Sequence, residues 1–263
     1  MHHSFFILAS GIILLSFTAV ISKLIIWPVL IIVFSRAGLA FLFLLLFLFA
    51  KKETIKIPIS TRLKAITGGV FLAIHWWTYF KAVDLAGVAI GLSSLFTFPI
   101  ITAIIEPIIL KQKIKSHIYW CSILSLIGII ILVWDHSVNQ LIISGMLIGI
   151  VSAIAYTTRN LISKPLIKVI SGTQLMMIQS LVSFFVYLMI IFYDGFDWTI
   201  LVINTNQFLL ILLLGIVFTG IAHTLFLTAL NYYSVSFVSL LACIQPLLGT
   251  ILAIMIINEQ PTF

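Results

Sequence analysis

The chain has 263 residues, of which 62% are hydrophobic and only 8% are charged, and its formal net charge is +7 at pH 7. This composition excludes a water-soluble globular domain, because too few polar residues are available to cover the surface. It also argues against a nucleic-acid partner, since the basic residues lie in short gaps between long apolar runs, where membrane proteins place them. The two cysteines, Cys121 and Cys243, each lie within such a run, and the sequence contains no disulfide framework, metal-ligand cluster or cofactor motif.

In chain order, nine apolar runs are long enough to cross a bilayer, which takes about 20 residues per helix. Their approximate bounds are 4–26, 28–50, 63–82, 87–110, 116–134, 141–163, 171–193, 207–230 and 234–257. No run alternates apolar and polar residues as a barrel strand would, and backbone groups in lipid must be paired within their own segment. The sequence therefore predicts an all-α integral membrane protein with nine complete transmembrane helices.

The lysines and arginines predict how these helices are oriented. They gather after the second and fourth runs and around the end of the sixth, at Lys51, Lys52, Lys56, Arg62, Lys64, Lys111, Lys113, Lys115, Arg159, Lys164 and Lys168. All three places fall on one side if the helices alternate in direction, and the basic side of a membrane protein is cytoplasmic. We therefore expect a multi-pass protein of the cell membrane (the inner membrane in a Gram-negative cell) with a cytoplasmic N-terminus.

Identical residues recur at an offset of 147 residues, which indicates an internal repeat. The pairs are Gly68/Gly215, Ala82/Ala229, Val88/Val235, Pro99/Pro246 and Ile104/Ile251. The repeating unit is five helices, so its two copies enter the membrane from opposite sides, an arrangement found in secondary transporters. We predict two inverted repeats, at 1–135 and 141–263. The second would lack its fifth helix, and Glu259 to Thr262 reads as a linker, so we expect a truncated tenth helix.

Several motifs occur in a specific order along the runs. They are Arg36 within Phe34-Ser35-Arg36-Ala37, the stretch from Ala82 to Gly91, Phe98-Pro99, Gln245-Pro246 and Glu259. In this order and spacing the chain resembles the drug/metabolite transporter superfamily, and its EamA-like family in particular. The resemblance covers nearly the whole chain. It implies two five-helix repeats, a central substrate cavity, alternating access without ATP, and export of amino acids or related metabolites.

Glu106 and Arg36 are charges inside apolar runs, where charges are costly and often functional. Glu106 shares roughly one helix face with Pro99. It either pairs with the basic cluster Lys111–Lys115 or lines a cavity and binds substrate or protons. Arg36 anchors neighbouring helices, reaches outward to the membrane surface, or binds a substrate carboxylate through its fork of N–H donors.

The aromatic run from His75 to Phe80 supplies three further candidates. Trp76 and Tyr79 belong either to the belt of aromatic residues at a membrane interface or to a binding site. His75 lies deeper and is either a hydrogen-bonded core residue or, with Glu106, a proton or substrate site. His223 is a weaker candidate of the same kind.

Pro99 and Pro246 each remove a backbone donor inside a run and bend the helix, as structural kinks or as hinges. Gln245 would present its amide beside the carbonyl groups that Pro246 frees. Gly87/Gly91 and Gly145/Gly149 are pairs of small residues, spaced for close helix packing.

We therefore expect a secondary transporter that moves a small polar metabolite, with an amino acid or derivative as the first choice, and no enzyme activity. Its partners would be that substrate, membrane lipid and, as a candidate coupling ion, the proton. The alternatives are a membrane-embedded lipid-modifying enzyme, against which the scattered acids argue, and lipid scrambling or an assembly role. The candidate substrate-binding residues are Arg36, His75, Trp76, Tyr79, Glu106, His223 and Gln245, and the candidate hinges are Pro99 and Pro246.

Overall fold

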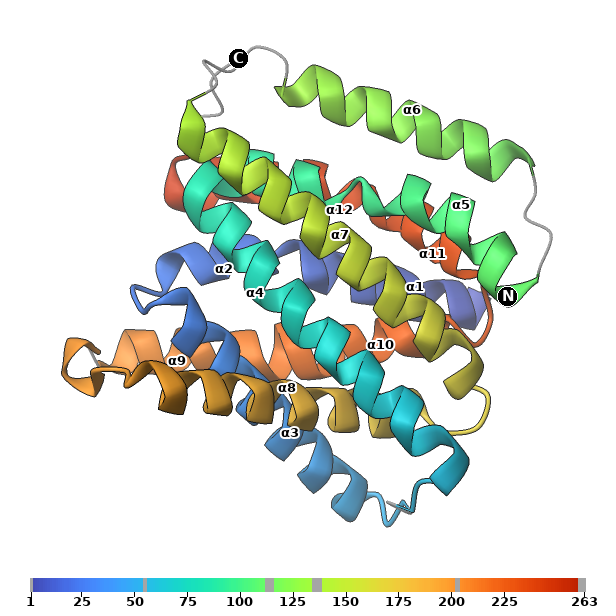
Figure 1. Ribbon diagram of the computed structural model, residues 1–263, viewed down its shortest axis with the longest axis horizontal. Helices are drawn as coiled ribbons and strands as arrows, with labels where there is room; N and C mark the ends of the chain where they lie inside the picture. Colours follow the sequence, from blue (N-terminus) through green and yellow to red (C-terminus); the bar gives the residue numbers. More distant parts are fainter. Residues whose placement is uncertain (1, 54–55, 112–115, 134–138, 202–203, 260–263) are drawn as a thin grey trace.

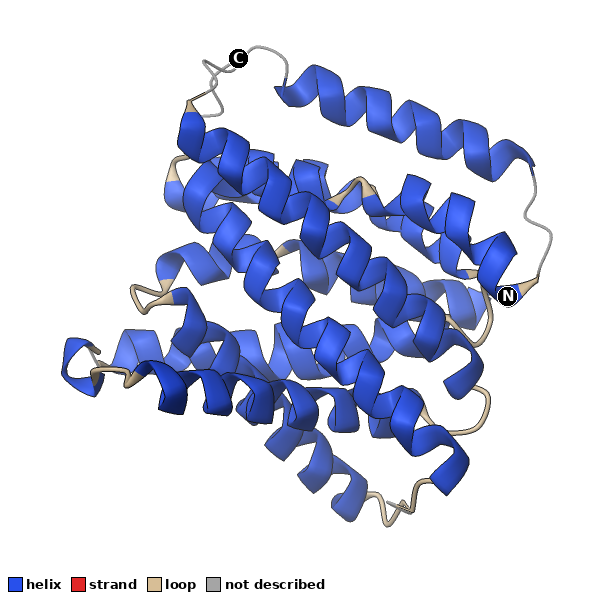
Figure 2. Ribbon diagram, in the orientation of Figure 1, coloured by secondary structure: helices blue, strands red, loops and turns tan. Residues whose placement is uncertain are grey.

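The computed structural model describes residues 2–53, 56–111, 116–133, 139–201 and 204–259. Throughout these ranges every regular element is a helix (Figure 2). Helices pair the backbone N–H and C=O groups within one segment, as a lipid environment requires. The prediction of an all-helical fold is confirmed for the described residues.

The elements follow one another in this order: α1 (His2–Ser16), α2 (Thr18–Leu24), α3 (Val29–Ala50), α4 (Ile59–Leu95), α5 (Phe98–Leu110), α6 (Ser116–Val133), α7 (Gln140–Leu166), α8 (Gly172–Asp194), the 3₁₀-helix η1 (Trp198–Ile200), α9 (Thr205–Gly215), the π-helix η2 (Ile216–Ile221), α10 (Ala222–Ala229), α11 (Val235–Ala242) and α12 (Ile244–Ile257). Several helices of the second half begin at a polar cap. The side chains of Ser171, Asn204 and Ser234, for example, each accept a hydrogen bond from an amide of the first turn that has no partner within its helix.

Within the described ranges, seven helical segments are long and apolar enough to span a bilayer: His3–Leu24, Val29–Ala50, Ile59–Leu110, Gln140–Leu166, Gly172–Asp194, Thr205–Ala229 and Val235–Ile257. The third has 52 residues, far more than one crossing of about 20 residues requires. It contains α4 and α5, where the sequence predicts two separate helices. The expected count of nine spans therefore stays a prediction.

The turn that the sequence predicts at 83–86 lies one residue later, at Gly87, where two helices of α4 meet at a sharp kink. Gly87 has φ 80° and ψ 173° there, while helical residues continue on either side. A positive φ strains residues that carry a Cβ, so glycine is the residue suited to this position. Gly87 thus serves the backbone bend rather than the helix packing expected for it.

Helix pairs distant in the sequence form the body of the molecule (Figure 1). The closest associations are α4 with α7, α3 with α8, α4 with α8, and α1 with α10. Gly145 and Gly149 of α7 lie against α4, where a Cβ on Gly145 would approach Ala86 Cβ to 2.7 Å and one on Gly149 would approach Ser94 Cβ to 2.7 Å. This confirms the predicted packing role of the Gly145/Gly149 pair. α6 lies along the edge of the bundle, at the top of Figure 1.

Large apolar side chains also cover the outside of the bundle. Phe6 is 70% exposed, Ile59 80% and Met255 74%. A water-soluble monomer seldom exposes so many large apolar groups, whereas a lipid-facing surface requires them.

Two basic residues that the sequence places at the cytoplasmic surface are buried within α7. Arg159 is fully buried and Lys164 is 8% exposed. Arg159 donates to Gln179 Oε1 (2.7 Å) and to Asn160 Oδ1 (3.0 Å). The surface assignment of these two residues is wrong, because polar groups of the bundle supply the partners that water would otherwise provide.

The predicted boundary between the two repeats falls partly at 134–138, and the predicted linker includes 260–262. Both lie outside the described residues.

Candidate functional site

A small cavity of about 30 Å³ lies between the helices. Its walls come from both halves of the chain and are formed by Leu15, Thr18, Arg36, His75, Trp76, Tyr79, Leu92, Leu95, Phe96, Phe98, Tyr156, His223 and Gln245. A volume of this size holds about one or two waters. The cavity is therefore too small for a metabolite of amino-acid size.

The cavity brings together six of the seven side chains that the sequence predicts for substrate binding. These are Arg36, His75, Trp76, Tyr79, His223 and Gln245. All six are buried, and they come from α3, α4, α10 and α12. Glu106 is not part of its lining.

Arg36 is a fully buried cation whose hydrogen-bonding capacity is only partly used. Its Nε donates to Thr219 Oγ1 at 2.8 Å. The guanidinium carbon lies 4.5 Å from the ring centroid of Trp76 and 4.8 Å from that of Phe80, within cation–π range. Nη1 and Nη2 have no hydrogen-bond partner among the described residues. The alternative that Arg36 reaches the membrane surface is wrong, because the side chain has no exposed area.

Trp76 and His223, which are 147 residues apart, contact each other in this wall. The indole Nε1 donates to His223 Nε2 at 3.4 Å. Because an indole N–H can only donate, Nε2 accepts and the neutral imidazole carries its proton on Nδ1. Nδ1 is buried without a partner among the described residues. His223 therefore adds an unpaired donor to those of Arg36 in the lining of the cavity.

His75 is held in place by Ser152 of α7. The Ser152 hydroxyl donates to the His75 carbonyl oxygen at 2.9 Å, and its oxygen lies 2.8 Å from His75 Nδ1. Since the single hydroxyl proton goes to the carbonyl, Nδ1 must donate to Ser152 Oγ. The ring also stacks on Tyr156, with centroids 4.3 Å apart. The orientation of His75 is thus determined from two sides.

We expect Ser152→Ala to lower the free energy of unfolding, because it leaves the buried His75 Nδ1 unpaired, while the His75 carbonyl keeps its hydrogen bond from Thr78 Oγ1 (3.1 Å). An unsatisfied buried group costs about 1–3 kcal/mol. Thermal unfolding of the purified chain in detergent measures the change. Ser144→Ala is the control in the same helix, since its hydroxyl donates only to the Gln140 carbonyl near the exposed end of α7. An equal loss in both variants would contradict the special role of Ser152.

Glu106 is not part of the cavity lining and, among the described residues, contacts neither His75 nor Lys111, whereas Lys113 and Lys115 of the basic cluster lie outside the described residues. Its carboxylate is fully buried and accepts hydrogen bonds from the amides of Val235 (2.8 Å) and Ser236 (2.7 Å), at the start of α11. A carboxylate at a helix N-terminus satisfies amides that lack an intrahelical partner. The predicted pairing of His75 with Glu106 is therefore absent from the structure.

Tyr156 and Thr18 are lining residues that sequence reasoning missed. Thr18 Oγ1 is a further buried polar atom without a partner among the described residues. Tyr156 begins the stretch Tyr156-Thr157-Thr158-Arg159-Asn160, which is unusually polar for the interior of an apolar run. That polarity was the available signal for Tyr156, whereas Thr18 carries no comparable one.

Both candidate hinge prolines follow a break in a helix. α4 ends at Leu95 and α5 begins at Phe98, just before Pro99. α11 ends at Ala242 and α12 begins at Ile244, just before Pro246. Each proline lies in a first helical turn, where its missing N–H leaves no bond unmade. Phe96 lines the cavity at the first break, and Gln245 lines it at the second.

A model of the EamA-like transporter family matches residues 3–134 and 143–263 of the chain. The uncharacterized transporter YxxF of Bacillus subtilis is 22% identical over 202 residues, which is 76% of this chain and 63% of that protein. An uncharacterized transporter of Clostridium kluyveri is 29% identical over 191 residues, or 70% of this chain and 58% of that protein. The chain thus aligns with about three fifths of the length of each relative.

A solved crystal structure with the same fold is among those that the chain resembles. It superposes with a TM-score of 0.81 at 16% sequence identity, over all of this chain and 91% of that one. An identity this low supports the fold alone.

Proposed function

Because the chain belongs to the EamA-like transporter family, we propose that it carries a small metabolite with a free carboxylate, such as an amino acid or derivative, across the membrane by alternating access. The observation that carries this proposal is Arg36, a buried cation at the cavity wall whose Nη1 and Nη2 have no partner among the described residues. A guanidinium fork binds a carboxylate through two parallel hydrogen bonds. The family match favours this function over the membrane enzyme considered from the sequence.

The other polar atoms of the lining support an anionic group. Arg36 and His223 Nδ1 are donors without partners among the described residues, and the Thr18 hydroxyl can also donate. None of the described residues that line the cavity is acidic. A carboxylate would satisfy several of these donors at once, and buried polar groups require such partners.

The aromatic lining suggests that the rest of the substrate is partly apolar. Trp76, Tyr79, Phe98 and Tyr156 line the site, and Phe98 and Tyr156 pack edge to face at 5.1 Å. Aromatic faces bind apolar groups and, through their quadrupole, ammonium groups. An amphipathic zwitterion therefore fits the chemistry of these walls, with Gln245 as an additional hydrogen-bonding group.

The proposed mechanism requires the cavity to enlarge. Its 30 Å³ admits no metabolite of amino-acid size, so substrate entry needs the walls to separate on one side at a time. We assign the hinges to the breaks before Pro99 and Pro246. We also retain His75 as the candidate proton-exchanging group, without Glu106.

Two inverted repeats, 1–135 and 141–263, with a cytoplasmic N-terminus remain part of the proposal. The contact between Trp76 and His223 supports the repeat, because the two positions are related by its offset of 147 residues. The breaks at Phe96 and Cys243 have the same spacing.

A ligand screen tests the substrate class. The purified full chain is heated with each of a set of L-amino acids and with their matched carboxamides and decarboxylated amines. We expect at least one acid to raise the melting temperature, since a ligand at 100 times its Kd stabilises the folded state by about 2.7 kcal/mol. The corresponding carboxamide and decarboxylated amine should leave the melting temperature unchanged. Equal stabilisation by acid and amide would contradict carboxylate recognition.

A further inference from the structure

Two short turns are close in sequence to residues that line the cavity. The first turn (84–88) contains the kink of α4, and the second turn (230–235) joins α10 to α11. A movement of either turn would shift cavity walls on both sides of it. The flanking lining residues are Tyr79 and Leu92 for the first turn, and His223 and Gln245 for the second.

A buried carboxylate binds the start of the helix after the second turn. Glu106 Oε1 accepts from the amide of Val235 at 2.8 Å. Its Oε2 accepts from the amide of Ser236 at 2.7 Å and from the Ser236 hydroxyl at 2.5 Å. Three donors thus converge on one carboxylate.

The first turn is held in the same way by another glutamate. Glu259 Oε1 accepts from the amide of Val88 at 2.8 Å and more weakly from that of Ala89 at 3.5 Å. Val88 corresponds to Val235 at the repeat offset of 147 residues, and Ala89 corresponds to Ser236. The two carboxylates therefore bind equivalent backbone positions, except that the first turn lacks the hydroxyl.

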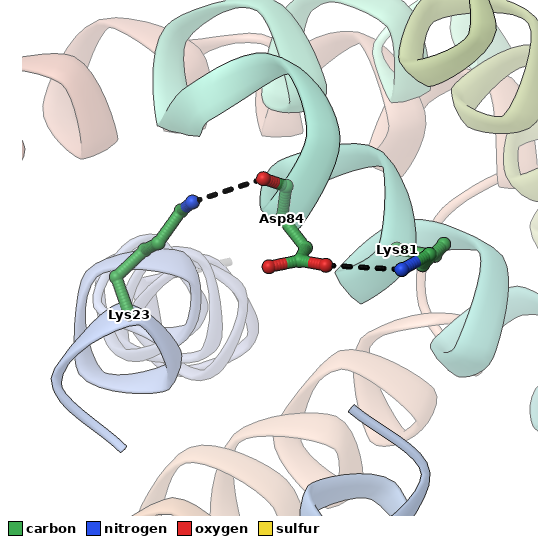
Figure 3. Close-up of polar contacts among 3 residues, drawn as sticks. All are labelled: Lys23, Lys81 and Asp84. Atoms are coloured by element: carbon green, nitrogen blue, oxygen red, sulfur yellow. Dashed lines mark hydrogen bonds and ion pairs between the residues drawn. The ribbon is translucent and has the colours of Figure 1, made fainter. Parts of the chain in front are cut away.

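A lysine binds the carbonyl side of each turn. Lys164 Nζ donates to the carbonyls of Leu230 (2.5 Å) and Tyr233 (2.7 Å). Lys23 Nζ donates to the carbonyl of Asp84 at 3.3 Å (Figure 3). A cation at the C-terminal end of a helix and an anion at the N-terminal end are both favoured by the helix dipole. Each turn is thus bound by one lysine and one glutamate.

The two pairs differ in their contact with solvent. Glu106 and Lys164 are 0% and 8% exposed, and we name this pair the dry latch. Lys23 and Asp84 are exposed, and the ion pair between Lys81 and Asp84 (3.1 Å) beside them is exposed as well. We name the partly buried Glu259 together with the exposed Lys23 the wet latch. Electrostatic contacts are stronger where water is excluded, and exposed ones contribute little.

Each glutamate comes from the opposite half of the chain. Glu106 lies on α5 and binds the second turn, while Glu259 follows α12 and binds the first. In Figure 1 the end of α2, which bears Lys23, lies at the left of the bundle, and the connection from α10 to α11 lies at the right. The latches therefore tie the two halves together at opposite ends.

From this arrangement we propose that the two turns are the two gates of the transport cycle, and that each gate opens when its own latch breaks. The inference rests on the transport function proposed above. The dry latch holds its gate more firmly, so the gate at the wet latch opens first. Glu106, Glu259, Lys164 and Lys23 are positioning residues, since none of them lines the cavity.

The test measures access to the cavity from each side of the membrane. Thr18→Cys, in a background of Cys121→Ser and Cys243→Ala, reports access of a charged, membrane-impermeant methanethiosulfonate added to either face of reconstituted vesicles. Ser236→Ala removes one bond to Glu106 and reproduces the wet latch, so we expect about tenfold faster labelling from the face of the second turn. Ala89→Ser offers Glu259 a hydroxyl, so we expect slower labelling from the other face only. Glu106→Gln should accelerate labelling from the face of the second turn more than Ser236→Ala does.

The two exchanges are matched controls for each other, because they swap one hydroxyl between equivalent positions. Ser236→Ala keeps the carboxylate, so the test stands even if Glu106→Gln fails to fold. Two results would overturn the proposal. One is equal labelling of Thr18→Cys from both faces when no further substitution is present. The other is an unchanged labelling rate in both Ser236→Ala and Ala89→Ser. The measurement needs no substrate. Normal sidedness with no carboxylate binding would refute the substrate proposal and leave the gates intact.

Discussion

Arg36→Gln is expected to abolish stabilisation by any carboxylate ligand of the chain, with an affinity loss of about 2–5 kcal/mol for losing one member of a buried charge pair. Gln can neither supply the positive charge nor form the two parallel hydrogen bonds of Nη1 and Nη2. The measurement is the ligand-dependent shift in melting temperature, followed by calorimetry on the ligand with the largest shift.

The melting temperature without ligand separates a binding defect from a folding defect. Arg36 is a buried cation that is only partly satisfied, and replacing such a group is often neutral or stabilising. We therefore expect Arg36→Gln to keep or raise the unliganded melting temperature. Arg36→Lys retains the charge without the fork and should bind with intermediate affinity. Parental affinity in Arg36→Gln would show that the carboxylate binds elsewhere.

Gly149→Val is expected to lower the free energy of unfolding by more than the about 1–3 kcal/mol that typical overpacking costs. A Cβ at Gly149 would overlap Ser94 Oγ and approach Ser94 Cβ to 2.7 Å. Ser94 cannot turn away without breaking its hydrogen bond to the Gly91 carbonyl (3.0 Å). The helices α4 and α7 must therefore separate, and they form a principal contact between the halves.

Thermal unfolding in detergent measures this loss. Ile150→Val, at the next position, is the control, because Ile150 is 37% exposed on the outer side of α7. A comparable loss in both variants would mean that the close approach at Gly149 contributes little to stability.

The helical fold could be predicted because each lipid-spanning segment is a long apolar run, and such a run can pair its backbone only as a helix. The kink of α4 could be placed closely, because the gap at 83–86 between two predicted runs directly precedes Gly87. Its geometry could not be predicted, because the sequence neighbours of Gly87 do not reveal its positive φ.

Most of the cavity could be predicted because polar and aromatic groups stand out within apolar runs. Arg36, His75 and His223 each interrupt such a run, and all three line the site. Arg159 interrupts a run in the same manner, but it was interpreted as a surface charge near a helix end. Its partner Gln179 lies 20 residues away on α8, so only the packing of α7 against α8 identifies it as buried.

Glu106 illustrates a contact that residue identity cannot predict. Its partners are backbone amides 129 and 130 residues away, and every residue except proline carries such an amide. A carboxylate in an apolar run signals a buried partner, while the choice between substrate, proton and helix terminus depends on the three-dimensional path of the chain.

The π-helix at Ile216–Ile221 makes the site asymmetric with respect to the two halves of the chain. A π-turn holds one residue more than an α-turn, whereas the corresponding stretch of the first half, 69–74, lies within α4 as an ordinary helix. Thr219, which binds Arg36 from this π-turn, has the buried apolar residue Leu72 as its counterpart. The two halves thus present different chemistry to a bound molecule. We therefore expect a ligand held at Arg36 to bind in a single favoured orientation.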